Sequence, residues 1–586
     1  MHRNKPKRKF TPLLMCDFYK LAHRPLFPDK TEKVYSVLLS RTNKYLPTAD
    51  KTIALGFQSF VLKYLIDYFE ENFFDLPEEE MVAEYEYIVK HTLGEDYAES
   101  DHVRALHKLG YLPIKISSLE EGSAVPVQTP LMTIENTHPD FYWIPNFLET
   151  LLSCELWQMM TSASIARSYR KLLESYALET VGNIDAVDFQ AHDFSMRGMS
   201  SVETSKLSGF GHLAFFKGTD TVPAIGYAME YYNADLEKEL VGTSIPATEH
   251  SVMCANTPIG GDSLDEYEAF RRIIQDKFKR GFVSIVSDSY DFWKVIDETL
   301  PRLKSIIMER DGKVVIRPDS GNPVDILCGT PIIDLDKVSY VESLEDAKEY
   351  MEEFLDDEMR ESTPHGEYGG DSSNATFKFE DKYYHICVSF EWNRYDKQYY
   401  YIDGVSISSC EEYTPSVEEL GLIESLWNIF GGHVNDLGYK ELDSHIGAIY
   451  GDSITYERAK EILSRLKAKG FASTNIVFGV GSYTYQYNTR DSLGFAMKAT
   501  YNVCDGKEGL LFKDPKTDSG KRSPRGMLHV YRNEYGNYIT TDGLFEDTLA
   551  ALNEQHPNEL KPLFQDGKLL RETSLEEIRE RAKLTL

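Results

Sequence analysis

The chain contains four short apolar or β-branched runs, and each one ends in a turn of polar residues and glycine. These runs with their turns occupy residues 283–291, 314–323, 446–453 and 476–482. Such runs predict strands that are buried on both faces, as in a parallel sheet. Apolar residues at helical spacing between the runs, as in 455–469, predict helices that alternate with the strands. The pattern predicts an α/β fold, and we expect an irregular (β/α) barrel of parallel strands.

The turn at the end of residues 314–323 carries the side chains that most clearly indicate chemistry. Arg317 is suited to a bidentate grip on a phosphate group. Asp319 can hold sugar hydroxyls or a metal ion, and the backbone N–H groups of Ser320 and Gly321 can face an anion. Barrel enzymes place their chemistry on the loops that follow the strands. The sequence therefore predicts a sugar-phosphate site at these strand ends.

The overall charge limits how such a site can work. The 586-residue chain has a formal net charge of -31, so broad attraction to nucleic acid or to an anionic membrane is not expected. A phosphate must instead be bound by a few convergent cations. The seven cysteines show no metal-ligand spacing, and the basic N-terminus is not followed by a long apolar segment. We therefore expect reduced thiols, no signal peptide, no membrane span and a cytoplasmic location.

Changes in pattern along the chain predict its domains. Residues 186–498 are expected to form the barrel-like domain, interrupted by a β-rich insertion at 326–414 that contains a helix at 344–360. Residues 1–185 and 499–586 are expected to form a second α+β domain built from both chain ends.

Several further polar residues have both a functional and a structural interpretation. Phe194 can stack on a flat ring while Arg197 binds a phosphate or polarises a carbonyl. By itself, this stretch is better explained by a core phenylalanine and a salt-bridged surface arginine. Taken alone, Asp220 is typical of a turn or cap, and His250 beside Glu249 is more often structural than catalytic.

Two cations, Arg490 and Lys498, follow the glycine turn at 479–482. Ordinary solvated charge is the simplest explanation of such residues. That explanation is weaker here, because the two cations lie beside a glycine turn in an acidic chain.

Taken together, the motifs resemble the nicotinamide phosphoribosyltransferases of the type II phosphoribosyltransferase superfamily. The matching stretches occur in the family's order and span most of the chain outside the insertion: 17–20, 192–197, 216–220, 246–250, 287–291, 316–323, 450–452, 489–491 and 512–515.

The resemblance implies that nicotinamide displaces pyrophosphate from phosphoribosyl pyrophosphate, with magnesium (Mg²⁺), to give nicotinamide mononucleotide. It implies that Phe194 stacks on one face of the pyridine ring and that Tyr19, acting across a homodimer interface, covers the other. Arg197 would contact the amide oxygen, with the Ser284 hydroxyl close by. Asp220 would accept a hydrogen bond from the amide nitrogen and repel the carboxylate of nicotinate.

The resemblance also implies the residues that hold the rest of the substrates. They are Asp319, Gly451 and Asp452 for the ribose, Gly481 and Ser482 for its phosphate, and Arg317, Arg490 and Lys498 as clamps for phosphate or pyrophosphate.

His250 matches the histidine that the family phosphorylates with ATP as co-substrate, and either Glu249 or Asp288 could orient its ring. The sequence does not identify which residues would bind the metal ion.

Two departures from the family affect the phosphate pocket. The chain has Gly481, Ser482 and Tyr483 where the family commonly has a run of glycines, and Ala496 replaces a phosphate-contacting serine. Two other functions stay open: a nicotinate phosphoribosyltransferase, against which Asp220 argues, and a non-catalytic binding protein on the same scaffold.

Overall fold

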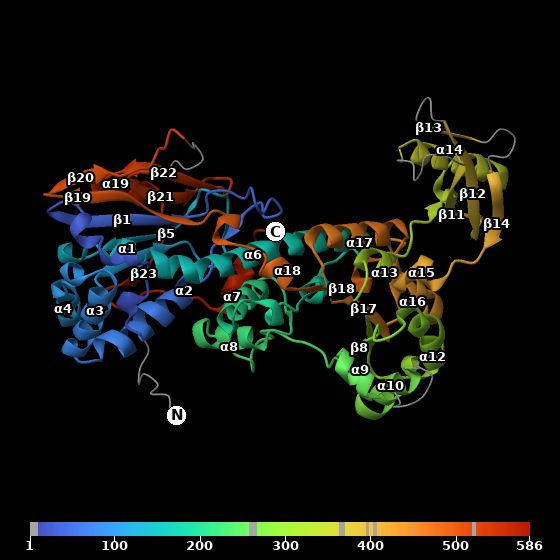
Figure 1. Ribbon diagram of the computed structural model, residues 1–586, viewed down its shortest axis with the longest axis horizontal. Coiled ribbons are helices and arrows are strands. Elements are labelled where there is room, and N and C mark those ends of the chain that lie inside the picture. The colour runs from blue at the N-terminus through green and yellow to red at the C-terminus, as the bar shows by residue number, and fades with distance from the viewer. Residues whose placement is uncertain are drawn as a thin grey trace. The chain divides into compact units, whose positions relative to one another are not determined.

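The computed structural model describes residues 10–256, 266–361, 370–393, 398–401, 407–451, 453–517 and 523–586 (Figure 1). Its contacts divide the chain into two compact units. The first contains residues 1–244, 451–457 and 477–586, and the second contains residues 245–450 and 458–476. The domain boundaries expected from the sequence stay a prediction.

The described helices have these bounds in chain order: α1 Phe18–Leu21, α2 Phe57–Phe60, α3 Glu78–Thr92, α4 Asp101–Leu109, α5 Ile144–Phe147, α6 Glu149–Thr180, α7 Val202–Leu213, α8 Val222–Tyr231, α9 His250–Asn256, α10 Tyr267–Arg271, α11 Phe292–Lys294, α12 Leu300–Met308, α13 Pro323–Cys328, α14 Leu344–Glu361, α15 Val417–Leu420, α16 Leu422–Phe430, α17 Tyr456–Ala468, α18 Ser482–Tyr485, α19 Glu546–Gln555 and α20 Leu575–Lys583. The helices expected at 344–360 and 455–469 are confirmed as α14 and α17.

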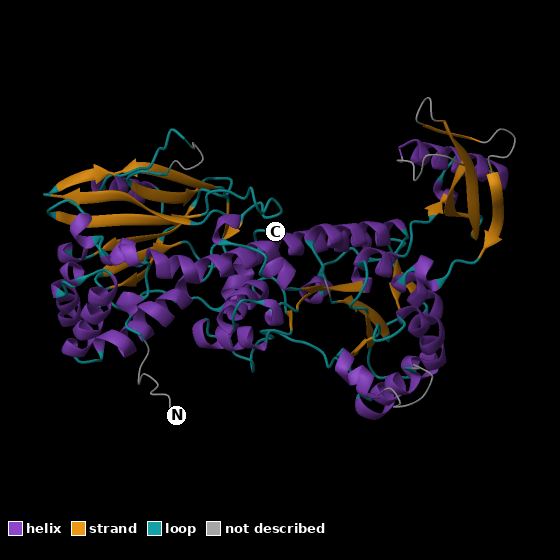
Figure 2. Cartoon of the chain, viewed as in Figure 1, coloured by secondary structure: helices purple, strands orange, loops and turns teal. Residues whose placement is uncertain are grey.

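The first unit contains an antiparallel sheet, drawn as orange arrows in Figure 2, and the labels and colours of Figure 1 show that both ends of the chain contribute to it. Its seven strands lie in the order β20 (Lys507–Leu510), β19 (Ala496–Cys504), β1 (Thr31–Leu39), β5 (Pro130–Asn136), β3 (Ile114–Ser118), β23 (Lys561–Gln565) and β24 (Lys568–Leu569). Two smaller antiparallel pairs belong to the same unit: β2 (Thr52–Ile53) with β4 (Ala124–Val125), and β21 (Met527–Arg532) with β22 (Tyr538–Leu544).

Parallel strands occur in both units, and several residues expected at the site lie on them or just after their ends. In the first unit β6 (Ala191–Asp193) pairs in parallel with β7 (Gly218–Thr219) and β18 (Ile476–Val480). In the second, β9 (Val314–Arg317) pairs in parallel with β8 (Val283–Val286) and β17 (Ile446–Tyr450). The four strands expected from the apolar runs are therefore confirmed. The fold is mixed α/β with parallel strands, and closure into a barrel stays a prediction.

The β-rich insertion has its own apolar core. Strand β12 (Lys382–Asn393) pairs with β11 (Gly370–Phe379) on one edge and with β13 (Gln398–Tyr401) and β14 (Ile407–Tyr413) on the other. β10 (Ile333–Asp334) continues the sheet beside β11. Buried side chains of α14 pack on one sheet face, and this core includes Met351, Leu355, Phe377, Ile386 and Val388.

Tyrosines on the insertion hold it to helices of the same unit. The hydroxyl of Tyr413 donates to Glu419 Oε2 over 2.6 Å, and that of Tyr383 donates to Glu424 Oε1 over 3.3 Å. Lys469 also pairs with Glu424, at 2.9 Å. The tyrosine-rich sequence thus has a structural use in this part of the chain.

None of the described helices is both long and apolar enough to cross a lipid bilayer.

We expect Phe377→Ala to destabilise the insertion by about 3–5 kcal/mol, because the change leaves a cavity in a core where the ring is fully buried and stacks on Tyr384 at 5.3 Å. Hydrogen exchange of the β11 and β12 amides would measure this loss locally. Asn374→Ala, on the exposed face of β11, is the control and should change protection little. Unchanged protection in Phe377→Ala would contradict the independent core.

Candidate active site

The ring of Phe194 lies against a backbone that has no side chain. A Cβ atom added to Gly479 would lie 2.5 Å from Phe194 Cδ2 and 2.8 Å from Gly451 Cα. The Phe194 N–H also donates to the carbonyl of Val480 over 2.9 Å, so the aromatic residue is fixed at the end of β18. Two of the expected site residues, Phe194 and Gly451, are thus brought together at Gly479.

A second close approach joins the segment with Arg197 to the expected phosphate turn. A Cβ atom on Gly198 would overlap the hydroxyl of Ser482. Ser482 is the first residue of α18, and Gly481 precedes it as the helix cap. The first N–H groups of a helix have no intrahelical acceptor and can donate to an anion. Arg197, which is exposed, directly precedes Gly198 and so lies next to the contact between Gly198 and the Ser482 side chain.

Asp220 follows β7, and two side chains donate to the same carboxylate oxygen. Oδ1 of Asp220 lies 2.9 Å from His192 Nε2 and 2.5 Å from Ser244 Oγ. The ring of His192 is 4.7 Å from that of Phe194. The carboxylate is therefore held near the aromatic ring through His192, and its side chain is still 43% exposed.

His212 is a supporting residue that the sequence analysis missed. Its Nε2 must donate to the carbonyl of Gly218, at 2.9 Å, so its Nδ1 accepts from the Tyr485 hydroxyl at 2.7 Å. The side chain is fully buried, and burial lowers its pKa to about 4. His212 thus ties β7, which precedes Asp220, to α18, which begins at Ser482. Its partners lie 6 and 273 residues away, and no local pattern marks it.

Four cations gather around the expected phosphate clamp. Burial lowers the pKa of Lys498, which lies on β19, although the carboxylate of Glu149 raises it. The charges of Arg41, Lys513 and Arg490 lower this pKa further. Arg41 was not singled out in the sequence, because it lies over 400 residues from the others and follows β1. Its Nε donates to the carbonyl of Gly494 over 2.9 Å.

In the second unit, two of the expected site residues each have a polar side-chain atom that is buried without a hydrogen-bond partner among the described residues. These atoms are Nε of Arg317, at the end of β9, and the hydroxyl of Ser284, in β8. The Arg317 Nη2 donates to the carbonyl of Thr248 over 2.9 Å, which fixes the guanidinium. A ligand or water could satisfy these atoms, so both residues are suited to bind a substrate, although the same state occurs at buried residues elsewhere in the described chain.

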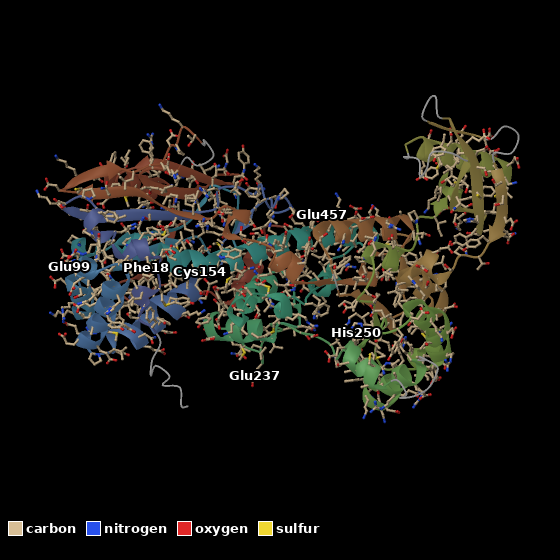
Figure 3. All side chains as sticks on the ribbon, viewed as in Figure 1. Phe18, Glu99, Cys154, Glu237, His250 and Glu457 are labelled. Atoms are coloured by element: carbon tan, nitrogen blue, oxygen red, sulfur yellow. The ribbon has the colours of Figure 1, made fainter. Side chains whose placement is uncertain are left out.

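Asp288 links the histidine and the turn that the sequence analysis singled out. Its Oδ1 lies 3.3 Å from Nε2 of His250, the first residue of α9 (Figure 3). Its Oδ2 accepts from the Asp319 N–H over 3.0 Å and from the Ser320 hydroxyl over 2.6 Å. Glu249 instead accepts from the hydroxyl of Ser251. Of the two carboxylates considered for the histidine ring, Asp288 is the one in contact.

The remaining expected residues are placed as follows. Asp452 lies outside the described residues. Tyr19 on α1 is 57% exposed, and its ring meets His23 edge-on at 4.9 Å. Within the ranges that the structure describes, no three His, Cys, Asp or Glu side chains are grouped to hold a metal ion.

Comparison with known proteins assigns this chain to a family. Residues 189–556 match the model of the nicotinate phosphoribosyltransferase (NAPRTase) family. The chain belongs to this family. It is 38% identical to a nicotinamide phosphoribosyltransferase of Acinetobacter baylyi over 584 residues, which cover 98% of this chain and 97% of that protein.

Two further relatives carry the same name. The nicotinamide phosphoribosyltransferase of Mycoplasma pneumoniae is 32% identical, over 88% of this chain and 95% of its own length. The nicotinamide phosphoribosyltransferase of Mycoplasma genitalium is 31% identical, over 89% of this chain and 96% of its own length. The resemblance found in the sequence is confirmed, and so is the expectation that this NAPRTase-family member is a pentosyltransferase.

Protonation of His212 should make stability depend on pH. Between about pH 6.5 and pH 4 the unfolded chain binds a proton at this histidine and the folded chain does not, so lowering the pH through this window should reduce the free energy of unfolding, by on the order of 3 kcal/mol. His212→Gln, which does not titrate, should reduce the slope of the pH profile in this window, while His91→Gln at an exposed helix position should not. The remaining slope would come in part from His102, whose pKa burial also lowers to about 4. Denaturant unfolding at several pH values measures the free energy of unfolding of each protein. Identical pH profiles for His212→Gln and the unaltered chain would refute the lowered pKa of His212.

Proposed function

We propose that this phosphoribosyltransferase transfers the phosphoribosyl group of phosphoribosyl pyrophosphate to nicotinamide, giving nicotinamide mononucleotide and pyrophosphate in NAD salvage. The observation that carries the proposal is the carboxylate of Asp220, held by His192 next to the ring of Phe194. A carboxylate there accepts from an amide N–H and repels a second carboxylate, so it favours nicotinamide over nicotinate. The names of the relatives support the same substrate.

The reaction breaks the bond from C1 of the ribose to the pyrophosphate oxygen and forms a bond from C1 to the pyridine nitrogen. Positive charge develops at C1 and negative charge on the leaving group, so catalysis depends on positioning and charge stabilisation. In this proposal Phe194 stacks on the pyridine ring and Asp220 fixes its amide. Arg197 and Ser284 contact the amide oxygen.

In this proposal the phosphoribosyl group is held by cationic side chains and by backbone N–H groups. We assign phosphate or pyrophosphate to Arg317, Arg490 and Lys498, with Arg41 and Lys513 adding charge near the last two. The N–H groups of the turn at 481–482 would receive the ribose phosphate. Loss of one clamp should cost about 2.7–4 kcal/mol of transition-state stabilisation if it resembles the loss of an oxyanion donor.

The residues fit Mg²⁺ bound mainly through the substrate. This ion keeps several waters and uses one or two carboxylates together with substrate phosphates, so a three-residue cluster is not required. Asp319 has no side-chain partner among the described residues and is only partly exposed, so it is the carboxylate we assign to the ribose hydroxyls or to the metal. When bound, the ion would neutralise charge on the leaving pyrophosphate.

ATP coupling and a homodimer complete the proposal, in a cytoplasmic enzyme. ATP would phosphorylate His250, whose side chain is 48% exposed. Because Asp288 lies against Nε2, phosphate on Nδ1 would leave the Nε2–H···Asp288 bond in place, whereas phosphate on Nε2 would set two anions against each other. Tyr19 is exposed on α1 and available to a second chain, where it would cover the pyridine ring.

Changing Asp220 should change the choice of substrate. We expect Asp220→Ser and Asp220→Asn to lower the selectivity for nicotinamide over nicotinate by at least about tenfold, the equivalent of 1.4 kcal/mol, because the repulsive charge is removed. The measurement is mass spectrometry of the mononucleotides formed when both substrates compete at equal concentration.

Asp491→Asn, which removes a carboxylate exposed beside Arg490, is the charge-matched control and should keep the selectivity. Predominant nicotinate mononucleotide from the unaltered chain would overturn the substrate assignment. No product from either substrate would favour a non-catalytic scaffold.

His250→Ala should abolish the stimulation by ATP while leaving transfer without ATP within a fewfold of its original rate, since the histidine couples the reaction and does not contact the transferred group. Asp288→Asn should weaken the stimulation, because the ring loses its charged partner. Glu249→Gln is the matched control, as this carboxylate contacts Ser251 instead. Initial rates with and without ATP measure the stimulation. Mass spectrometry of the intact protein shows whether phosphate is attached to it. Full ATP coupling in His250→Ala would contradict phosphohistidine.

A further inference from the structure

A cavity in the first unit has a cationic lining and shares no residue with the site described above. Its volume is about 320 Å³. The polar side chains that line it are Lys51, Ser123, Arg532, Asn537, Tyr538, Arg581 and Thr585. Among the described residues no carboxylate lines it. This is unexpected in a chain with 94 acidic and 63 basic residues.

Another cavity of the same unit shows the contrast. It has a volume of about 400 Å³, and its lining holds two lysines and four carboxylates: Lys63, Lys206, Asp67, Glu71, Glu203 and Glu230. The lysines there are neutralised, because Glu203 pairs with both. The positive lining of the first cavity is therefore a local property and not a general one.

Lys51 is the cation in this cavity that lacks an anion. Its ammonium makes no ion pair with any residue in the part of the chain that the structure describes. Burial lowers its pKa, and so does the nearby charge of Arg167, against the attraction of Asp50. Both oxygens of Asp50 are already taken, by Arg167 at 2.5 Å and by Lys171 at 2.9 Å. A partly buried lysine surrounded by cations would gain most from a bound anion.

The two arginines are held in place before any ligand arrives. Arg581 Nη1 donates to the carbonyl of Glu121 over 2.6 Å. The Arg532 guanidinium lies 4.6 Å from the centre of the Tyr538 ring, and its Nη2 donates to the Tyr538 hydroxyl over 2.6 Å. Such preorganisation reduces the entropy lost on binding.

The carboxylates that approach the arginines leave donors free. Glu120 lies 3.8 Å from Arg581 Nε, and Glu559 lies 3.5 Å from Arg532 Nε. Both approaches are long for a charge-assisted hydrogen bond. Because a guanidinium has five N–H donors, each arginine still has donors for a ligand.

We propose that this cavity is a second ligand site of the chain, and that it binds a small organic phosphate through Lys51, Arg532 and Arg581. The arginines would grip the phosphate oxygens and Lys51 would supply the compact charge. Asn537 offers a neutral donor and acceptor for the rest of the molecule. The volume lies within the range typical of small-molecule sites and fits a compound of sugar-phosphate size.

Calorimetric titration of the full chain with ribose 5-phosphate at low ionic strength tests the proposal. We expect two sites per chain, of which Arg490→Ala weakens only the active site and Lys51→Met weakens only the second by about tenfold or more. Lys51→Met breaks no hydrogen bond among the described residues, and unchanged initial rates would show that it is folded.

Lys238→Met is the control. It removes the same charge from an exposed lysine of the same unit that pairs with Asp235 and does not line the cavity, so the second site should stay within about twofold of its original affinity. Asn537→Asp, in an exposed turn, places a carboxylate in the lining and should weaken binding as Lys51→Met does. A single site abolished by Arg490→Ala, or equal weakening by Lys51→Met and Lys238→Met, would overturn the proposal.

Discussion

The aromatic part of the site depends on the missing side chain at Gly479. The ring of Phe194 and the backbone of Gly451 both occupy the space that a Cβ would need. Any side chain at this position would displace Phe194, and protein interiors absorb such shifts poorly. His192 packs on Phe194 and donates to Asp220, so a displaced Phe194 would also disturb the hydrogen bond that positions the carboxylate. One backbone contact thus determines where both the stacking surface and the discriminating charge lie.

Charge is used locally in this chain, although its formal net charge is -31. Salt screens exposed charges beyond about 8–10 Å, so a phosphate close to Lys498 responds to Arg41, Arg490 and Lys513 more than to distant carboxylates. Burial and these three like charges all lower the pKa of Lys498. Each cation there would therefore gain from an anion that separates it from the others. An acidic surface and a phosphate site are physically compatible for this reason.

Local sequence patterns predicted the elements well and their partners poorly. The β-branched runs predicted β8 and β9, and helical spacing predicted α14 and α17, because these signals lie within a few residues. His212 was missed because its role consists of contacts with Gly218 and Tyr485, which folding alone brings together. For the same reason sequence could not decide between Glu249 and Asp288. Glu249 is adjacent to His250 in the sequence, but it is Asp288, just after the end of β8, that contacts the ring.

Asp288 shows why the supporting residues matter as much as those that would touch substrate. Its side chain is only 4% exposed, and its two oxygens face three groups, on His250, Asp319 and Ser320. Leaving such a buried carboxylate without these partners would cost several kcal/mol, so the turn and the histidine are held in one arrangement. A change of charge on His250 would alter its interaction with Asp288, and therefore also the hydrogen bond that Asp288 accepts from the backbone N–H of Asp319. A phosphorylation event at the histidine would thereby reach the strand-end turn by contact, with no need for a larger movement of the chain.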